Sequence, residues 1–78
     1  MNNNTSKMIL TKLNRMDVSD VEITNHLVSK GYPITRSAIW RQRTGEIYKA
    51  YNLNVDNDLL ALLQARKDFI AMVEGVTK

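Results

Sequence analysis

The sequence contains no cysteine and only one histidine, His26. The lack of cysteine excludes disulfide bonds and cysteine-ligated metal sites, and a single histidine argues against a structural zinc site. No apolar run approaches the roughly 18 residues that a membrane span requires, and the polar first residues do not resemble a secretory signal peptide. We therefore expect a soluble, cytoplasmic protein with no cofactor, no metal, no small-molecule ligand and no membrane partner.

Residues that interrupt helices are also scarce, with three glycines and one proline in 78 residues. Alternating, strand-like patterns are rare, whereas apolar residues recur at helical spacing along most of the chain. Hydrophobic residues make up 44% of the chain and charged residues 24%, which is typical of a folded globular protein. The sequence thus predicts a single all-α domain, residues 1–78, with four to five helices and a small core.

Local signals predict where these helices begin and end. The segment 19–22 is typical of a capping box, in which the Ser19 hydroxyl accepts from the Glu22 amide at the start of a helix. Gly31 is a left-handed stop for that helix, Thr35 is the N-cap of the next one, and Gly45 ends it. The predicted helices are these: one that begins after Thr5 or Ser6 and includes Met16, then 20–30, 36–44, and a last one from Asn57 or Asp58 to Glu74.

The segment 46–55 is ambiguous. It predicts a helical turn followed by a loop, with a short strand from Tyr51 to Val55 as the alternative, because apolar and asparagine residues alternate there. Asp56 or Asn57 is the expected cap of the last helix, and Gly75 is its expected stop.

Positive charge is concentrated in one part of the chain. Residues 30–50 hold five basic side chains and one acidic side chain, a net charge of +4, whereas the whole chain carries +3. Such a concentration is typical of a module that meets phosphate groups. A solvated basic surface is an equally good interpretation of the charge alone.

The predicted helix 36–44 has two distinct faces. At 100° per residue, Ile39 and Ala38 share one side with Gln42 beside them, and Arg43 lies at the edge. The opposite side carries Arg36, Ser37, Trp40, Arg41 and Thr44. An exposed tryptophan needs a partner, so Trp40 either contacts DNA or packs over Ile9 or Leu13 in the core.

The segment 23–41 resembles the bacterial and phage helix-turn-helix DNA-binding family, of the Cro and repressor type. The matching features are a positioning helix that ends at Gly31, the apolar Ile34, the cap Thr35 and the buried Ile39. The connection from Gly31 to Thr35 is about two residues longer than in the tightest form of the motif. The resemblance implies that the following residues contact DNA: Thr35, Arg36, Ser37, Trp40, Arg41 and Thr44. Bidentate arginine chemistry adds Arg43 as a candidate for base or phosphate contact.

The resemblance implies a small transcriptional regulator that binds double-stranded DNA. Two alternatives stay open: another phage DNA-binding role, such as packaging, excision or partition, and a helical protein-interaction module, such as an anti-repressor, that meets an acidic partner. Catalysis is not expected, because the sequence has no nucleophile with a nearby base pattern and no glycine-rich phosphate loop.

The last predicted helix has an apolar face wider than the roughly 100° stripe that a small domain needs. We therefore expect a homodimer, with residues 56–75 as the dimerisation helix. Leu62 and Phe69 are expected to face the core. The expected dimer interface consists of Leu59, Leu63, Ile70 and Val73.

Overall fold

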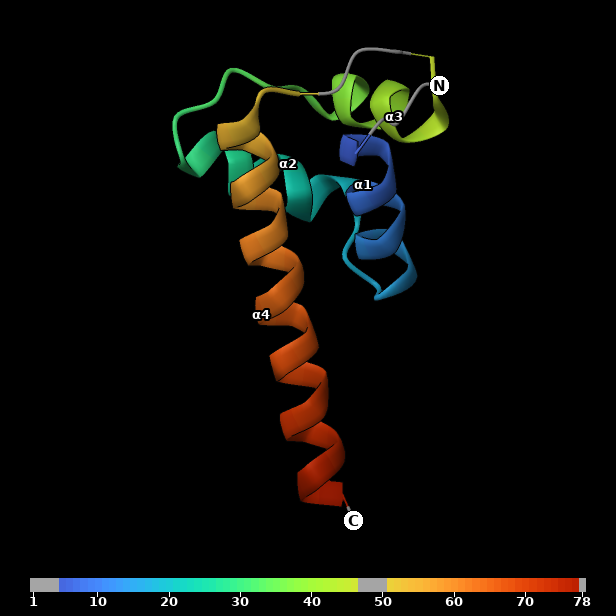
Figure 1. Cartoon of the computed structure of the whole chain (residues 1–78), viewed down its shortest axis with the longest axis vertical. Helices are drawn as coiled ribbons and strands as arrows, with labels where there is room; N and C mark the ends of the chain where they lie inside the picture. The colour runs from blue at the N-terminus through green and yellow to red at the C-terminus, as the bar shows by residue number, and fades with distance from the viewer. Residues whose placement is uncertain (1–4, 47–50, 78) are drawn as a thin grey trace.

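The computed structural model describes residues 5–46 and 51–77, and this part of the chain contains four α-helices and no strand (Figure 1). The helices are α1 (Thr5–Arg15), α2 (Asp20–Ser29), α3 (Arg36–Thr44) and α4 (Leu53–Thr77). The predicted all-α class is confirmed. Among the described residues, no helix combines the length and the apolar character that crossing a lipid bilayer requires.

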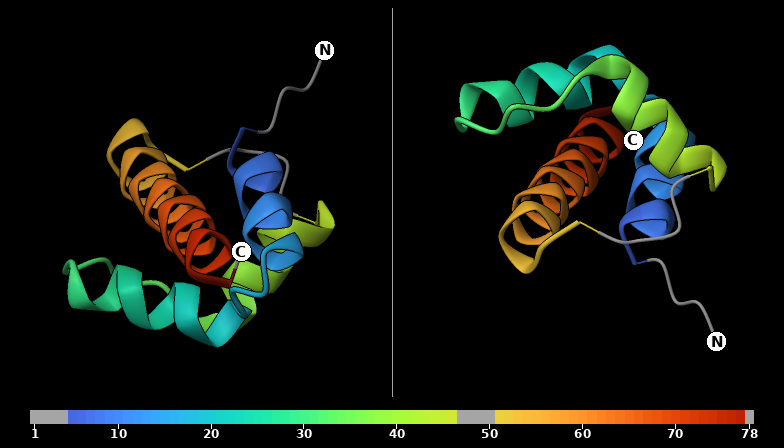
Figure 2. Two further views of the ribbon diagram at one scale, coloured as in Figure 1. Left: turned by 90° about the horizontal axis from the view of Figure 1, so that it is seen from below. Right: turned by 90° about the horizontal axis from the view of Figure 1, so that it is seen from above.

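The core lies where α1 and α2 pack against the first half of α4, and α3 packs on α1 and α2 (Figure 2). Each of the three shorter helices supplies one narrow apolar stripe, and the residues of these stripes are almost fully excluded from solvent. The buried hydrophobic residues are Ile9, Leu10, Leu13, Val18, Ile23, Leu27, Ile39, Val55, Leu59 and Leu63. Burial of these side chains is the main favourable contribution to the stability of the fold.

The predicted ends of α2 and α3 are confirmed. The Ser19 hydroxyl accepts a hydrogen bond of 3.2 Å from the amide of Glu22. Gly31 has a φ of +93°, which permits the amides of Gly31 and Tyr32 to close the last turn of α2 on the carbonyls of Val28 and Leu27.

Thr35 repeats the arrangement at the start of α3, where its hydroxyl accepts from the amide of Ala38 at 3.1 Å. Gly45, with a φ of +87°, ends that helix. These bonds satisfy backbone groups that a helix end otherwise leaves unpaired.

The first part of α4 differs from the prediction. The helix begins at Leu53, because the Asn52 side chain accepts from the amide of Val55 at 3.0 Å and so acts as the cap. Asp56 and Asn57, the expected caps, both lie inside α4, and Asp56 is instead a buried acceptor for the Ser6 hydroxyl at 2.6 Å. The strand alternative is wrong, since Leu53 and Val55 are helical, and residues 47–50 of the predicted turn lie outside the described residues.

The second part of α4 continues past the other helices and through Gly75, the expected stop (Figure 1). Two expected interface residues, Leu59 and Leu63, lie in the core of their own chain, with 0% and 7% exposure. Their assignment to a dimer interface is therefore wrong, because α1 and α2 already cover them. Phe69, expected in the core, is 49% exposed, since it lies beyond the reach of those helices.

The remaining expectations for α4 have mixed outcomes. Leu62 is partly buried against the core, as predicted. Ile70 is half-buried and Val73 is exposed, so both are still available for a contact with another chain.

Candidate nucleic-acid interface

The outward face of α3 carries most of the residues that the sequence suggests for DNA contact. Thr35 and the five residues predicted on that face are all exposed: Arg36, Ser37, Trp40, Arg41 and Thr44. On the opposite face Ile39 is buried, as predicted, and Gln42 beside it is buried as well. Trp40 is 48% exposed, so it belongs to the outward face and not to the core over Ile9 or Leu13.

Contacts from two other parts of the chain hold the inner face of α3. Ile39 is fully buried in the core, and the Tyr51 hydroxyl donates to the carbonyl of Ala38 at 3.5 Å. The Tyr51 amide in turn donates to the Ser6 hydroxyl of α1 at 2.8 Å. Burial, and secondarily the nearby Asp56 carboxylate, raises the pKa of Tyr51 to about 12, so its hydroxyl keeps its proton at neutral pH. The inner face therefore positions α3 without using any residue of the outward face.

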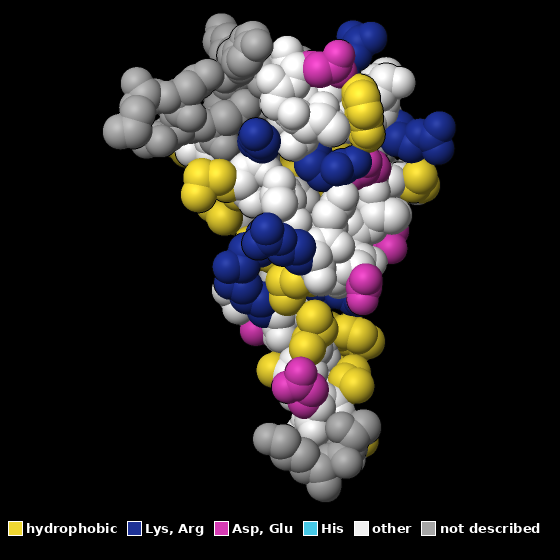
Figure 3. All heavy atoms as spheres, turned by 90° about the vertical axis from the view of Figure 1, so that its right-hand side faces the viewer, with side chains coloured by type: hydrophobic (Ala, Val, Ile, Leu, Met, Phe, Trp, Pro, Cys, Tyr) yellow, Lys and Arg dark blue, Asp and Glu magenta, His cyan; other side chains and the backbone are white. Residues whose placement is uncertain are grey.

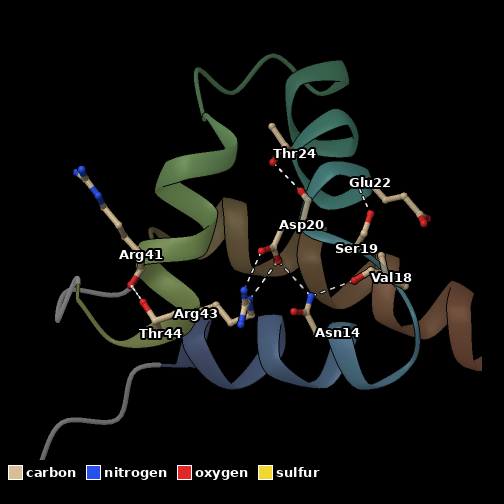
Figure 4. A network of polar contacts seen from close by, with 9 residues as sticks. All are labelled: Asn14, Val18, Ser19, Asp20, Glu22, Thr24, Arg41, Arg43 and Thr44. Carbon is tan, nitrogen blue, oxygen red and sulfur yellow. Dashed lines mark hydrogen bonds and ion pairs between the residues drawn. The ribbon is translucent and has the colours of Figure 1, made fainter.

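A three-helix junction fixes the rotation of α3 (Figure 4). The Arg43 guanidinium forms a bidentate ion pair (a fork) with the Asp20 carboxylate at the start of α2. Its Nε donates to Oδ1 at 3.2 Å and its Nη2 donates to Oδ2 at 2.9 Å. Asn14 of α1 donates to the same carboxylate at 3.2 Å and to the carbonyl of Val18 at 3.0 Å. The fork ties α3 to the start of α2, and Asn14 ties both to α1.

This junction changes the expected role of Arg43. A bidentate pair uses the same donors that would read a guanine or clamp a phosphate, so Arg43 acts as a positioning residue in this structure. Burial tends to raise the pKa of Asp20, but the hydrogen bonds from Arg43 and Asn14 and the charge of Arg43 outweigh it and lower that pKa. Asp20 is thus ionised at neutral pH and neutralises Arg43. Arg36, whose charge also lowers the pKa of Asp20, and Arg41 are the cations of the outward face.

The outward face is hollowed. An open depression of about 390 Å³ is lined by Ser37, Trp40, the two arginines and Asp20. In Figure 4 the Arg41 side chain points away from the Asp20 junction and into the surroundings of the molecule. Two guanidinium groups and an indole around one depression can offer hydrogen bonds, positive charge and an apolar surface to the same ligand.

The N-terminal end of α3 adds to this positive character. Backbone amides at a helix start carry a partial positive charge, and Arg36 lies in this first turn. The described residues contain no group of three or more His, Cys, Asp and Glu side chains that could hold a metal ion.

Sequence reasoning found the outward face but missed the roles of Asp20 and Asn14. The sequence places Asp20 at the start of the predicted helix 20–30, and nothing in the spacing of 14, 20 and 43 reveals that these residues meet. The one available signal was the position of Arg43 at the edge of the helical wheel, next to the buried face.

Comparison with protein-family models, with curated proteins and with solved structures finds no match to this chain.

Proposed function

We propose that this chain binds double-stranded DNA in a sequence-specific manner through the outward face of α3, as a small transcriptional regulator. The observation that carries the proposal is the separation of the two faces of α3. Its inner face is fixed by the core and by the Arg43–Asp20 fork, while Arg36, Trp40 and Arg41 stand exposed together. A helix held in this way can enter the major groove without disturbing the fold.

The exposed side chains have the chemistry that groove recognition needs. Arginine donates two parallel hydrogen bonds to the O6 and N7 atoms of guanine, so Arg36 and Arg41 are the residues for base or phosphate contact. Trp40 offers an apolar surface for thymine methyl groups or sugars, and Thr35, Ser37 and Thr44 offer hydroxyl groups for phosphates. The concentration of basic residues between 30 and 50 supports the same interpretation.

The likeness of 23–41 to the helix-turn-helix family supports the proposal, since α2 and α3 would correspond to its positioning and recognition helices. The connection from Lys30 to Thr35 is long for that motif, which leaves a DNA-binding role other than transcriptional control as the alternative. The position of the selected sequence beside a promoter would favour a regulator, and a position at a packaging, excision or partition site would favour the alternative.

The test begins with selection of binding sites from a pool of random duplexes, followed by affinity measurements on the selected duplex. Arg36→Ala and Arg41→Ala should each weaken specific binding by about 1–3 kcal/mol, which is roughly a 5- to 150-fold loss. Their circular dichroism should stay that of the parent, because both side chains are exposed.

Lys67→Ala is the matched control, since it removes one exposed positive charge from α4. It should reduce binding only slightly. If both arginine variants bind the selected duplex as tightly as the parent, or if the control loses as much affinity as they do, the assignment of α3 is wrong. If the basic face of α3 binds an acidic protein instead of DNA, the selection should enrich no duplex sequence.

A further inference from the structure

The second half of α4 leaves a row of large apolar side chains in solvent. Phe69, Met72 and Val76 are 49%, 60% and 80% exposed, and Val73 is exposed beside them. Figure 3 shows hydrophobic side chains gathered on the projecting part of the molecule, below the body formed by the other helices. Single exposed apolar residues are normal on a protein surface, but a continuous row of them marks a site of interaction.

The row has the spacing of a two-helix seam. Ala65, Phe69, Met72 and Val76 follow one another at intervals of four, three and four residues, which is the pattern that keeps one stripe facing a partner helix. Lys67 and Glu74 lie on the opposite side of the helical wheel. The core-facing residues Leu59 and Leu63 lie roughly 110° and 150° around the helical wheel from the centre of this seam, and Leu62, which packs partly on the core, lies at its edge.

We propose that two copies of this chain pair through the second half of α4, with the two helices antiparallel. In this register, Phe69 of each copy faces Met72 of the other, and Ala65 faces Val76. In heptad terms, Phe69 and Val76 occupy position a, and Ala65 and Met72 occupy position d. Each layer then joins an a residue of one copy to a d residue of the other, which permits knobs-into-holes packing. The proposal goes beyond DNA binding, and it can be tested without any DNA.

The charge of this segment favours a second copy as the occupant. From residue 64 to residue 77, the two basic residues Arg66 and Lys67 are balanced by Asp68 and Glu74, so two copies do not repel each other. The same neutrality gives no attraction for DNA, and no attraction for a strongly charged partner.

Packing and geometry favour the antiparallel arrangement. A parallel pair would stack Ala65 on Ala65 directly beside a Phe69 pair, which leaves a gap next to a crowded layer. An antiparallel pair opposes the two helix dipoles and keeps the two bodies, formed by α1, α2 and α3, at opposite ends of the seam. Because α4 projects beyond its body, the seams can approach without a clash between the bodies (Figure 1).

The area of the seam sets the expected strength of the pair. The exposed apolar side chains offer on the order of 400 Å² per copy, which is a typical size for an interaction patch and about half of a standard interface. We therefore expect a concentration-dependent dimer that sedimentation detects at several hundred micromolar protein.

Cysteine cross-linking tests the register directly, since the protein has no thiol of its own. Ala65→Cys and Val76→Cys both replace exposed residues. An equal mixture of the two variants, oxidised with diamide, should form covalent dimers that contain one chain of each kind. In the antiparallel pair, the two copies of residue 65 are separated by about 16 Å along the axis, too far for a disulfide bond. Either variant alone should therefore stay monomeric, and efficient cross-linking of Ala65→Cys by itself would overturn the antiparallel register.

Sedimentation with a matched pair of charge variants tests the seam. Phe69→Glu places two charges in the seam and should abolish the dimer, whereas Lys67→Ala, which changes the net charge by the same amount on the opposite side of α4, should leave it intact. Both residues are exposed in the single chain, so both variants should keep the parent circular dichroism. A parent protein that is monomeric at several hundred micromolar, or two variants that behave alike, would overturn the proposal and leave the DNA-binding proposal untouched.

Discussion

The two halves of α4 have similar apolar sequences and opposite surroundings. In the first half, Val55, Leu59 and Leu63 are buried under α1 and α2, and in the second half Phe69, Met72 and Val76 stand in solvent. The width of the apolar face of α4 predicted two contacts, one with the core and one with a second chain, on two sides of the same stretch of helix. In the structure the covered stretch and the uncovered stretch follow one another along the helix. An apolar helix face indicates that the helix packs against another element. The lengths of the neighbouring helices decide how much of that face is buried within the same chain.

The exposed surfaces of α3 and α4 extend this comparison. The outward face of α3 presents Arg36, Trp40 and Arg41, whereas the seam of α4 presents aliphatic side chains, methionine and one phenylalanine. A cationic face with one aromatic residue suits the phosphates and base edges of duplex DNA, and an uncharged apolar seam suits another apolar helix. We therefore assign DNA to the cationic face of α3 and a second copy of the chain to the apolar seam of α4.

The largest effect that separates the two halves of α4 should come from a buried charge. Leu63→Glu places a carboxylate among core residues, which costs several kcal/mol and should unfold a domain this small. Phe69→Glu, six residues later, should change the free energy of unfolding by less than about 1 kcal/mol. Urea denaturation at low micromolar concentration, where pairing contributes little, measures both. Equal losses in the two variants would contradict the boundary between the halves.

A smaller effect should locate that boundary more closely. The Arg66 guanidinium Nε donates to the carbonyl of Met16 at 2.8 Å, and the guanidinium carbon lies 5.5 Å from the centre of the Phe69 ring. Arg66→Ala should therefore cost about 1 kcal/mol of stability, because it removes a charged donor from a partly buried carbonyl. Lys67→Ala, the neighbouring exposed cation, should change stability by less than about 0.5 kcal/mol. Identical urea midpoints for the two variants would mean that the body ends before Arg66.

The elements that sequence reasoning placed correctly are those whose cause is local. The hydroxyls of Ser19 and Thr35 and the left-handed glycines 31 and 45 act on amides and carbonyls within a few residues, so the bounds of α3 and the start of α2 could be predicted. The start of α4 could not, because five Asn and Asp residues compete there for the cap. The tertiary bond from Ser6 to Asp56 takes one of them away.

The candidate site on α3 also contains residues that local periodicity predicts and residues whose role depends on tertiary packing. The outward set on α3 follows from helical periodicity, which needs only the position of Ile39 in the core. Helical periodicity does not predict that Arg43 pairs with Asp20 instead of contacting DNA. The two residues are 23 positions apart and meet only when α2 and α3 pack. The position of Leu59 and Leu63 in the core likewise depends on how far α1 and α2 reach along α4.

The central claim is that the outward face of α3 meets DNA, and the most direct measurement is amide chemical-shift mapping by NMR. Isotope-labelled protein would be titrated with a selected duplex of about 30 base pairs, long enough for two half-sites one helical turn apart. The account predicts that the largest shifts occur in residues 35–44 and that added salt reverses them. Largest shifts in the second half of α4, with residues 35–44 unchanged, would contradict it.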